Sequence, residues 1–399
     1  MVSARLKEMV NCFYFPALIM LAITVASYIR IDKAEFVVSP DNFILSKVKQ
    51  NATQNGCNLS SGIWIYDNIS YPLYKEKDCT FIGNDFTCER YGREDLKYQN
   101  WRWQPHHCDL PRFNGTALLE ILRNKKVIFV GDSLNRNQWT SLMCMIEPNL
   151  PPTTNKIIVL DGNLLKLRVE DYNTTIGFYW SPYLVESDGD DEYRHNQNQR
   201  TVRIKSIEKH GINWNDADIL IFDTFAWWLP KMTILWGSFE NPNAVYQKVK
   251  SSGRPYKIAI DTWANWLEYH INRNKTRIFF TSASPQSIGL TPWGNTVGCN
   301  NKREPTFDDI YWQSHPKHVM NAVESTIEKL KERGVNVQYL NITQLSSYRQ
   351  DAYQSVYTRD WKDVHLKDRD PNRSDCCHWC LPGVPDVWNE ILYAYIIKS

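Results

Sequence analysis

The hydrophobic positions of this chain form one long apolar stretch near the start and, later, short apolar runs that alternate with helix-like segments. Four runs rich in β-branched or aromatic residues each end in polar residues: "KVIFVGDS", "ADILIFDT", "TRIFFTSASP" and "VNVQYLNIT". Apolar residues recur at helical spacing around 134–146, 243–272, 316–333 and 385–397. This alternation predicts an α/β fold with a parallel central sheet flanked by helices. Ligands of such sheets bind beyond the C-terminal strand ends, so the polar strand ends mark the expected site.

The first apolar stretch predicts a membrane anchor. Residues 13–29, "FYFPALIMLAITVASYI", carry no charge, and basic residues stand on both sides of them. About 17 apolar residues reach the lower limit for a spanning helix, and a short span suits the thin membranes of the early secretory pathway. We therefore expect a cytosolic tail and a signal-anchor transmembrane helix within residues 1–30, and a stem over 31–55. A cleaved signal peptide is the alternative.

The cysteines and glycosylation sequons indicate that the rest of the chain is lumenal. Nine of the ten cysteines follow the apolar stretch, which in an oxidising compartment indicates a disulfide framework with one thiol left over. Zinc at Cys376, Cys377 and Cys380 is the rival reading, but no second ligand pair accompanies them, so we expect no metal. Eight Asn-x-Ser/Thr sequons begin at Asn51, Asn58, Asn68, Asn114, Asn173, Asn274, Asn341 and Asn372.

Composition suggests two parts beyond the stem and narrows the class of partner. Residues 56–110 are dense in Cys, Trp, Tyr and Gly, which predicts a small disulfide-rich subdomain before the α/β domain at 111–399. The 46 basic and 44 acidic residues leave a formal net charge of +2, which gives no support to nucleic-acid binding. The 16 Trp and 21 Tyr suit either sugar rings that stack on aromatic faces or a core rich in tryptophan.

Two polar motifs suggest acyl-transfer chemistry. Ser133 follows the first strand in the sequence Gly131-Asp132-Ser133 and opens a predicted helix, whose free N–H groups would stabilise an oxyanion. The alternative for Ser133 is a polar N-cap. A nucleophilic serine needs a base, and Asp375 and His378 are spaced so that both side chains can lie on one face of a turn. The alternative there is a capping aspartate and a structural histidine.

Together these motifs resemble a known family. Gly-Asp-Ser near the start of an α/β domain and Asp-x-x-His near its end are the first and last blocks of GDSL/SGNH esterases. Four segments are similar to the plant trichome birefringence-like polysaccharide O-acetyltransferases: "GDSLNRNQWTSLMC", "DCCHWCLPGVPDVWNEIL", "CDLPRFN" and "GIWIYDNISYPLY". The resemblance covers nearly all of the chain after the anchor and implies an SGNH-like fold with Ser133, His378 and Asp375 as catalytic residues.

The resemblance also implies a reaction and a compartment. A Golgi enzyme of this family, single-pass type II with a lumenal catalytic domain, puts acetyl groups on cell-wall glycan hydroxyls through a serine acyl-enzyme. No bound cofactor is expected, but an acetyl donor is required, for which acetyl-CoA is one candidate. The segments "KMTILWGSF" and "TSASPQSIGLTPWGN" resemble members that acetylate xylan; mannan or another glycan is the alternative acceptor. Two rival functions use the same motifs: an acetyl esterase, or a glycan-binding protein with a decayed site.

Several further residues are carried over from the resemblance. Gly131, Asp132, Arg136, Asn137 and Asp223 are assigned to the oxyanion and substrate region. Arg136 is interpreted as a donor or glycan anchor, against a helix-face ion pair. Asp223 departs from the family's usual Asn, and a carboxylate there repels an oxyanion unless it is protonated or turned away.

The resemblance and the composition make three more assignments. Glycan-stacking candidates, each weighed against a core role, are Trp227, Trp228, Trp263 and Trp266. The acidic run 186–192 is interpreted as a solvated loop. The implied disulfides are Cys57 with Cys108, Cys79 with Cys144, Cys88 with Cys380 and Cys299 with Cys376, which leaves Cys377 as the free thiol.

Overall fold

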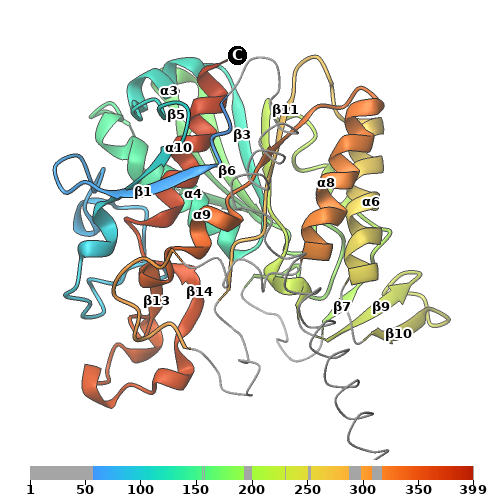
Figure 1. Cartoon of the computed structure of the whole chain (residues 1–399). Helices are drawn as coiled ribbons and strands as arrows, with labels where there is room; N and C mark the ends of the chain where they lie inside the picture. The colour runs from blue at the N-terminus through green and yellow to red at the C-terminus, as the bar shows by residue number, and fades with distance from the viewer. Residues whose placement is uncertain are drawn as a thin grey trace, which may run out of the picture. The chain divides into compact units, whose positions relative to one another are not determined.

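The central element of the computed structural model is a seven-stranded sheet (Figure 1). The structure describes residues 57–154, 156, 158–192, 200–229, 231–249, 253–286, 298–307 and 317–398. The strand order is β12-β11-β8-β3-β6-β5-β4; the first five strands are mutually parallel, and β5 and β4 are antiparallel to their neighbours. Their bounds are β3 Lys126–Gly131, β4 Ile158–Asp161, β5 Leu164–Val169, β6 Thr174–Trp180, β8 Ile219–Phe222, β11 Arg277–Thr281 and β12 Val337–Leu340.

The four strands expected from apolar runs are β3, β8, β11 and β12, and they are adjacent and parallel, so the predicted fold class is confirmed. Parallel register, with Val127 of β3 opposite both Ile176 and Ile219, brings the polar strand ends to one edge of the sheet. The strand β6 and the β4–β5 hairpin were not predicted. The strands β4 and β5 mix charged and apolar residues and are partly exposed, whereas β6 is buried and has no charged residue.

Helices cover both faces of the sheet (Figure 1). On one side α4 packs against α10 and α3, and on the other α6 packs against α8. The helix bounds are α3 Gly115–Ile121, α4 Ser133–Ile146, α5 Glu208–Gly211, α6 Gly253–His270, α8 Lys317–Glu332, α9 Thr343–Ser347 and α10 Val384–Ile397. Short 3-10 helices lie at 76–78, 97–100, 147–149, 170–172, 226–228, 350–352, 359–361, 366–368 and 371–373.

One predicted helix is wrong in its first half. The segment 243–272 was expected to be helical throughout, but α6 begins only at Gly253. Before it, β10 (Val245–Val249) pairs antiparallel with β9 (Met232–Trp236), which in turn pairs with β7 (Thr201–Val202) in a separate three-stranded sheet. The Val and Tyr residues of this stretch favour an extended ladder, and the helical periodicity of the longer window concealed them.

Tryptophans fill the core on the α6 side of the sheet. Trp214, Trp228 and Trp263 are fully buried there, and Trp263 meets Phe222 and Phe280 of the sheet edge-on at 5.4 and 5.1 Å. Rings of this size bury a large apolar area and pair edge-to-face, which stabilises the contact between helix and sheet. Much of the aromatic excess is therefore core packing.

The N-terminal segment, residues 59–110, packs on the rest of the chain, and residues 59–399 form one compact unit. Its strands β1 (Gly62–Tyr66) and β2 (Trp101–Pro105) form an antiparallel pair. Arg93 is buried and donates to the carbonyl oxygens of Asp351 and Tyr353, next to the two-stranded sheet of β13 (Tyr353–Ser355) and β14 (Asp375–Trp379). The N-terminal segment is thereby fixed to the strand pair near the C-terminus.

The disulfides join these parts. Cys79–Cys144, Cys88–Cys380 and Cys299–Cys376 are formed, and Cys57 and Cys108 are also disulfide-bonded. Among the described cysteines Cys377 alone is free. These are the bridges and the free thiol that the resemblance implied.

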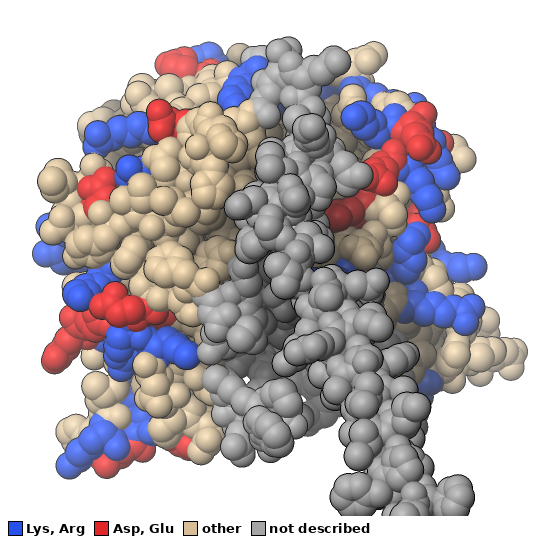
Figure 2. Space-filling model, in the orientation of Figure 1, with Lys and Arg blue, Asp and Glu red and all other residues tan. Residues whose placement is uncertain are grey.

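The predicted tail and anchor (1–30), the stem (31–55) and the sequon at Asn51 lie outside the described residues. Within the part of the chain that the structure describes, no helix has the length and apolar character needed to cross a bilayer. In that same part, no three His, Cys, Asp or Glu side chains are grouped in a way that could hold a metal ion. Basic and acidic side chains are interspersed over the described surface that Figure 2 shows.

Candidate active site

The turn between β3 and α4 holds Ser133 at the C-terminal edge of the sheet. Gly131 is required there, because a Cβ atom would come within 2.2 Å of the Asp223 carbonyl oxygen and 2.9 Å of the Asn135 Cβ. Asp132 is the N-cap of α4, since its carboxylate accepts from the Leu134 N–H at 2.9 Å. The capping alternative for Ser133 is therefore taken by its neighbour, and the Ser133 hydroxyl is left for other contacts.

Ser133, His378 and Asp375 form a continuous hydrogen-bonded chain. The Nε2 atom of His378 lies 2.7 Å from the Ser133 Oγ, and its Nδ1 lies 2.7 Å from an Asp375 carboxylate oxygen. With Nδ1–H donating to Asp375, Nε2 accepts from the serine hydroxyl, which is the arrangement that activates a serine nucleophile. All three residues are partly exposed, so a substrate can reach them.

The residues of the Asp-x-x-His motif meet within a strand rather than on a helical turn. Both lie in β14, whose pairing with β13 has an irregular register. Asp375 also accepts from the backbone N–H groups of Cys377 and His378, each at 2.9 Å, so its carboxylate folds back over its own strand. The spacing of three therefore brings the two side chains together, but along a strand, where the Asp375 carboxylate bonds to the Cys377 and His378 N–H groups and to the His378 ring.

Burial and charge shape the acidities of this pair. Burial favours the neutral acid of Asp375, but the neighbouring His378 and the two N–H donors outweigh it and lower the pKa of Asp375 below its usual value. Burial likewise acts to lower the pKa of His378, and the Asp375 carboxylate outweighs it and raises that pKa above its usual value. His378 is therefore a stronger base than a free imidazole.

Asn137 is not part of an oxyanion site. Its side chain is fully buried; it accepts from the Trp379 N–H at 2.9 Å and donates to the Trp379 carbonyl oxygen at 3.3 Å. These contacts bind the nucleophile helix α4 to β14, one residue after His378. The assignment of Asn137 to the oxyanion or substrate region is therefore wrong in this structure, because its amide is committed to the backbone.

Asp223 lies at the end of β8, beside the β3–α4 turn, and is 1% exposed. Burial, and then the nearby Asp132 carboxylate, raise the pKa of Asp223 well above its usual value. One carboxyl oxygen each of Asp132 and Asp223 is buried with no hydrogen-bond partner among the described residues. The raised pKa favours the protonated form of Asp223, and a protonated carboxyl group does not repel an oxyanion, so the departure from Asn at this position is compatible with acyl transfer.

Three of the four tryptophans proposed to stack on glycan are core residues. Trp228, Trp263 and Trp266 are at most 3% exposed, so their assignment to sugar stacking is wrong, and the alternative of core packing holds for them. Trp227 is half-buried; the Arg200 guanidinium lies 4.5 Å from its ring centre. Sequence alone does not separate these residues, because the exposure of each ring depends on α6 and on the loops around it.

Arg136 is close to the catalytic pair but is not a free cation. Its guanidinium contacts Asp85 at 3.1 Å and Glu192 at 2.6 Å, and it lies 5.5 Å from the Phe86 ring centre. The Phe86 ring in turn is 6.1 Å from the ring of His378. Asp85, Phe86 and Glu192 were not singled out from the sequence, since no local pattern links them to residues so distant in the chain.

Known proteins match nearly the whole of the described chain. A family model described as "GDSL/SGNH-like Acyl-Esterase family found in Pmr5 and Cas1p" matches residues 110–395, and one described as "PMR5 N terminal Domain" matches residues 55–109. "Protein trichome birefringence-like 34" of Arabidopsis thaliana is 47% identical over 351 residues, which cover 86% of this chain and 85% of that protein. From Oryza sativa subsp. japonica, "Xylan O-acetyltransferase 14" is 43% identical (88% of this chain, 80% of that protein) and "Xylan O-acetyltransferase 13" is 44% identical (87% and 70%).

Proposed function

The chain belongs to the GDSL/SGNH-like acyl-esterase family found in Pmr5 and Cas1p, and from this premise we propose that it is a xylan O-acetyltransferase that works through a serine acyl-enzyme. The observation that carries the chemistry is the hydrogen-bonded chain Ser133–His378–Asp375, with 2.7 Å at each link. The names of the rice relatives support acetyl transfer and xylan as acceptor.

In the first half-reaction the Ser133 Oγ attacks the carbonyl carbon of the acetyl donor, and its proton passes to His378 Nε2. The bond from the acetyl carbon to the donor's leaving group then breaks, and that group takes the proton from His378. The Ser133 N–H, in the first turn of α4 where helical N–H groups lack intrahelical acceptors, is placed to donate to the oxyanion. The Asp375 carboxylate stabilises the imidazolium in between.

In the second half-reaction a xylosyl hydroxyl replaces the donor. His378 Nε2 removes the hydroxyl proton, the sugar oxygen bonds to the acetyl carbon, and the Ser133 Oγ leaves with the proton from His378. Water in place of the sugar turns the same site into an esterase, so exclusion of water separates the two activities. Acetyl-CoA, a thioester, is the donor to test first.

The proposal includes the Golgi membrane as location, with residues 1–30 as a type II anchor and the catalytic part in the lumen. The disulfides support an oxidising compartment. Six sequon asparagines have exposed side chains, as glycosylation in a lumen needs: Asn58, Asn68, Asn114, Asn173, Asn274 and Asn372. Asn341 is half-buried, so it is the weakest of the described candidates.

The test uses the full-length chain in detergent, with acetyl-CoA and, separately, an activated acetyl ester as donor. Deacetylated xylan and mannan oligosaccharides are the acceptors, and mass spectrometry follows acetyl gain. We expect gain on xylan, an acetyl adduct on Ser133 in the absence of acceptor, and loss of both in Ser133→Ala and His378→Gln. The exposed His365→Gln is the matched control and should keep full activity.

Two outcomes overturn the proposal. Loss of acetyl from acetylated xylan without gain on deacetylated xylan assigns an esterase. Binding of xylan without an adduct on Ser133 from either donor assigns a glycan-binding protein. Gain on mannan rather than xylan keeps the transferase and changes its acceptor.

A further inference from the structure

Arg136 sits one turn after the nucleophile, and its guanidinium is held on two sides. Nη1 contacts Glu192 at 2.6 Å and Nη2 contacts Asp85 at 3.1 Å, while only 18% of the Arg136 side chain is exposed. A guanidinium offers a planar fork of donors that suits carboxylates, and both arms of this fork are occupied. An acidic group on a substrate would have to displace one of these carboxylates in order to bind Arg136.

Asp85 and Phe86 are fixed to the strand that carries the base. The Leu381 N–H donates to the Phe86 carbonyl oxygen at 3.0 Å, three residues after His378. The Cys88–Cys380 disulfide joins the same two segments. The N-terminal segment therefore places Asp85 beside Arg136, and the Phe86 ring near both Arg136 and His378, by contacts that are independent of Arg136.

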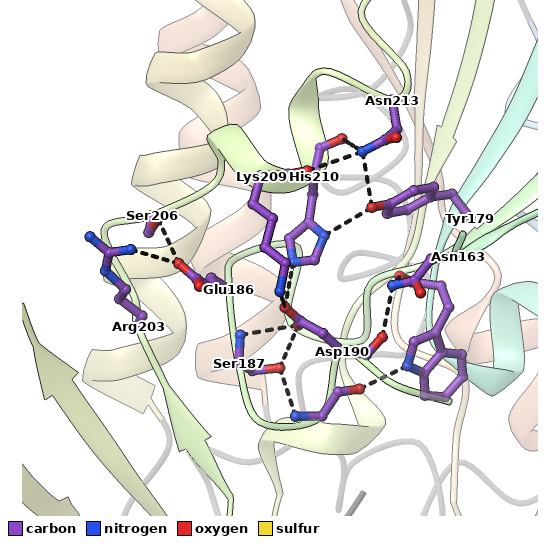
Figure 3. Close-up of polar contacts among 12 residues, drawn as sticks. Asn163, Tyr179, Glu186, Ser187, Asp190, Arg203, Ser206, Lys209, His210 and Asn213 are labelled. Atoms are coloured by element: carbon purple, nitrogen blue, oxygen red, sulfur yellow. Dashed lines mark hydrogen bonds and ion pairs between the residues drawn. The ribbon is translucent and has the colours of Figure 1, made fainter. Parts of the chain in front are cut away.

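Glu192 is the last residue of the acidic run 186–192, which was expected to be a solvated loop. Asp188 and Asp191 are exposed, but Ser187 and Asp190 are buried, and several polar side chains of the run are paired (Figure 3). Glu186 is paired with Arg203 at 2.7 Å and accepts from Ser206 Oγ at 3.1 Å. Asp188 accepts from the Thr201 N–H at 2.9 Å. These contacts fasten the first half of the run to β7 and the residues that follow it.

Asp190 fastens the second half of the run (Figure 3). It is 8% exposed; one carboxylate oxygen accepts from the Ser187 N–H and Oγ, and the other contacts Lys209 at 3.0 Å and His210 at 3.2 Å. His210 is fully buried and reaches the Tyr179 hydroxyl at 3.2 Å. Glu186, Asp188 and Asp190 are thus all held by other residues of the chain, and Glu192, two residues after Asp190, contacts Arg136.

We propose that Arg136 is a positioning residue: clamped by Glu192 and Asp85, it holds a fixed positive charge near His378 and does not bind the acetyl donor. The charged and titratable groups near His378 are Asp375 on its own strand, Asp132 and Arg136 at the start of α4, Asp223 at the end of β8, and the Cys377 thiol. Of these, Arg136 is the cation, and it disfavours the imidazolium, while the two clamping carboxylates offset its charge.

If the two carboxylates offset the charge of Arg136, the acid limb of the pH–rate profile should move in opposite directions in Arg136→Gln and Glu192→Gln. Arg136→Gln removes the cation and leaves its carboxylates beside the site, so the pKa of His378 rises and the acid limb of the pH–rate profile moves to higher pH. Glu192→Gln leaves the cation less compensated, so the acid limb moves to lower pH. Removal of one partly screened charge near a titrating histidine shifts such a limb by about 0.3–1 pH unit. A purely structural role predicts slower turnover in both variants, with no opposed shift.

The experiment measures the rate of Ser133 labelling by a fluorophosphonate against pH in the full-length chain. This readout needs no acetyl donor or acceptor; the inference rests on the proposed function only in that Ser133 is the nucleophile. Glu120→Gln is the matched control, since it removes an exposed carboxylate that pairs with Arg123 at 2.9 Å and takes no part in the clamp, and its limb should stay in place. Arg136→Lys keeps the charge, and we expect it to restore the limb even if labelling is slower.

Three results overturn the inference: limbs of Arg136→Gln and Glu192→Gln that move the same way, limbs that do not move in folded variants, or no labelling of Ser133 in the wild type. A fourth is an Arg136→Gln variant whose KM rises for acetyl-CoA but not for an uncharged acetyl ester, because that result assigns Arg136 to donor binding. Failure to acetylate xylan, together with normal labelling and opposed shifts, removes the proposed function but leaves the inference standing.

Discussion

Two buried acids of α10, Asp386 and Glu390, have raised pKa values. We therefore predict that the free energy of unfolding falls as pH rises from 4 to 8. Asp386 accepts from Ser141 of the nucleophile helix α4 at 2.6 Å and from the Tyr74 hydroxyl at 2.9 Å. Glu390 accepts from the Tyr71 hydroxyl at 2.6 Å. Burial raises the pKa of Asp386 from 3.8 to about 6 and that of Glu390 from 4.5 to about 7.

The sign follows from proton binding. Between the unfolded and folded pKa values the native state holds protons that the unfolded chain has released, so the free energy of unfolding falls with rising pH. The contribution of each acid is fully present below its unfolded pKa and is lost as pH passes through about 6 for Asp386 and about 7 for Glu390. At about 1.4 kcal/mol for each pKa unit, each acid contributes about 3 kcal/mol. That is a large share of the 5–15 kcal/mol typical of whole domains.

The assay is thermal unfolding of the full-length chain from pH 4.5 to pH 8. The double variant Asp386→Asn/Glu390→Gln keeps the hydrogen-bonding shape but cannot ionise, so its Tm should depend less on pH. We expect the difference between wild type and variant to change by on the order of 10 °C over this range. The exposed Asp368→Asn is the control and should follow the wild type. A double variant with the full pH slope of the wild type would refute the reasoning.

Three more predictions concern the supports and surroundings of the site. The Cys88–Cys380 bridge closes a loop that the Cys79–Cys144 and Cys299–Cys376 bridges shorten to about 170 residues, and Cys88→Ser/Cys380→Ser removes it. We expect the free energy of unfolding to fall by about 5 kcal/mol in thermal unfolding, and the labelling of Ser133 to become slower. Unchanged values would contradict the view that this bridge holds β14 in place. Burial raises the pKa of Asp223 well above its usual value, and Asp223→Asn has nearly the shape of the protonated acid, so transfer at pH 7 should stay within about threefold of the wild type. A hundredfold loss would mean that the ionised carboxylate is needed. Trp227→Ala should raise KM for xylan oligosaccharides without changing kcat, because Trp227 is half-buried. Trp263 is fully buried, so Trp263→Ala should lower the free energy of unfolding by about 3–5 kcal/mol and leave KM of the folded fraction unchanged. An increase of KM in Trp263→Ala alone would reverse the assignment of Trp227 to glycan contact and of Trp263 to the core.

Four strands of the sheet could be predicted from the sequence because the feature that identifies them, a short apolar run, is local. The runs that became β3, β8, β11 and β12 are apolar along their whole length, as strands buried on both faces must be, and their order of alternation with helices indicates parallel neighbours. The segment at 245–249 and the hairpin β4–β5 failed this reading because they are partly exposed, and their composition does not differ clearly from that of loops or helices.

The residues of the candidate site likewise fall into two groups: those that a local motif identifies, and those whose role depends on partners far away in the chain. Gly131, Ser133, Asp375 and His378 stand in short motifs whose spacing carries meaning, and their resemblance to a family was recognisable in the sequence. Arg136 was assigned from the sequence as an anchor or a member of an ion pair, but its partners could not be named, because Asp85 and Glu192 lie some fifty residues away on either side. Asn137 was misread because its partner is the backbone of Trp379.

By itself the sequence determined the chemistry that was available: an apolar strand that ends in Gly-Asp-Ser, an Asp-x-x-His near the C-terminus, and cysteines enough to join them. Only the tertiary structure decided how these groups meet. Burial is a property of the whole packed chain, so it alone separates Trp263 in the core from the half-buried Trp227 and raises the pKa of Asp223. Electrostatic pairing depends on distance in space, and no spacing along the chain records that Arg136 lies between two carboxylates beside His378.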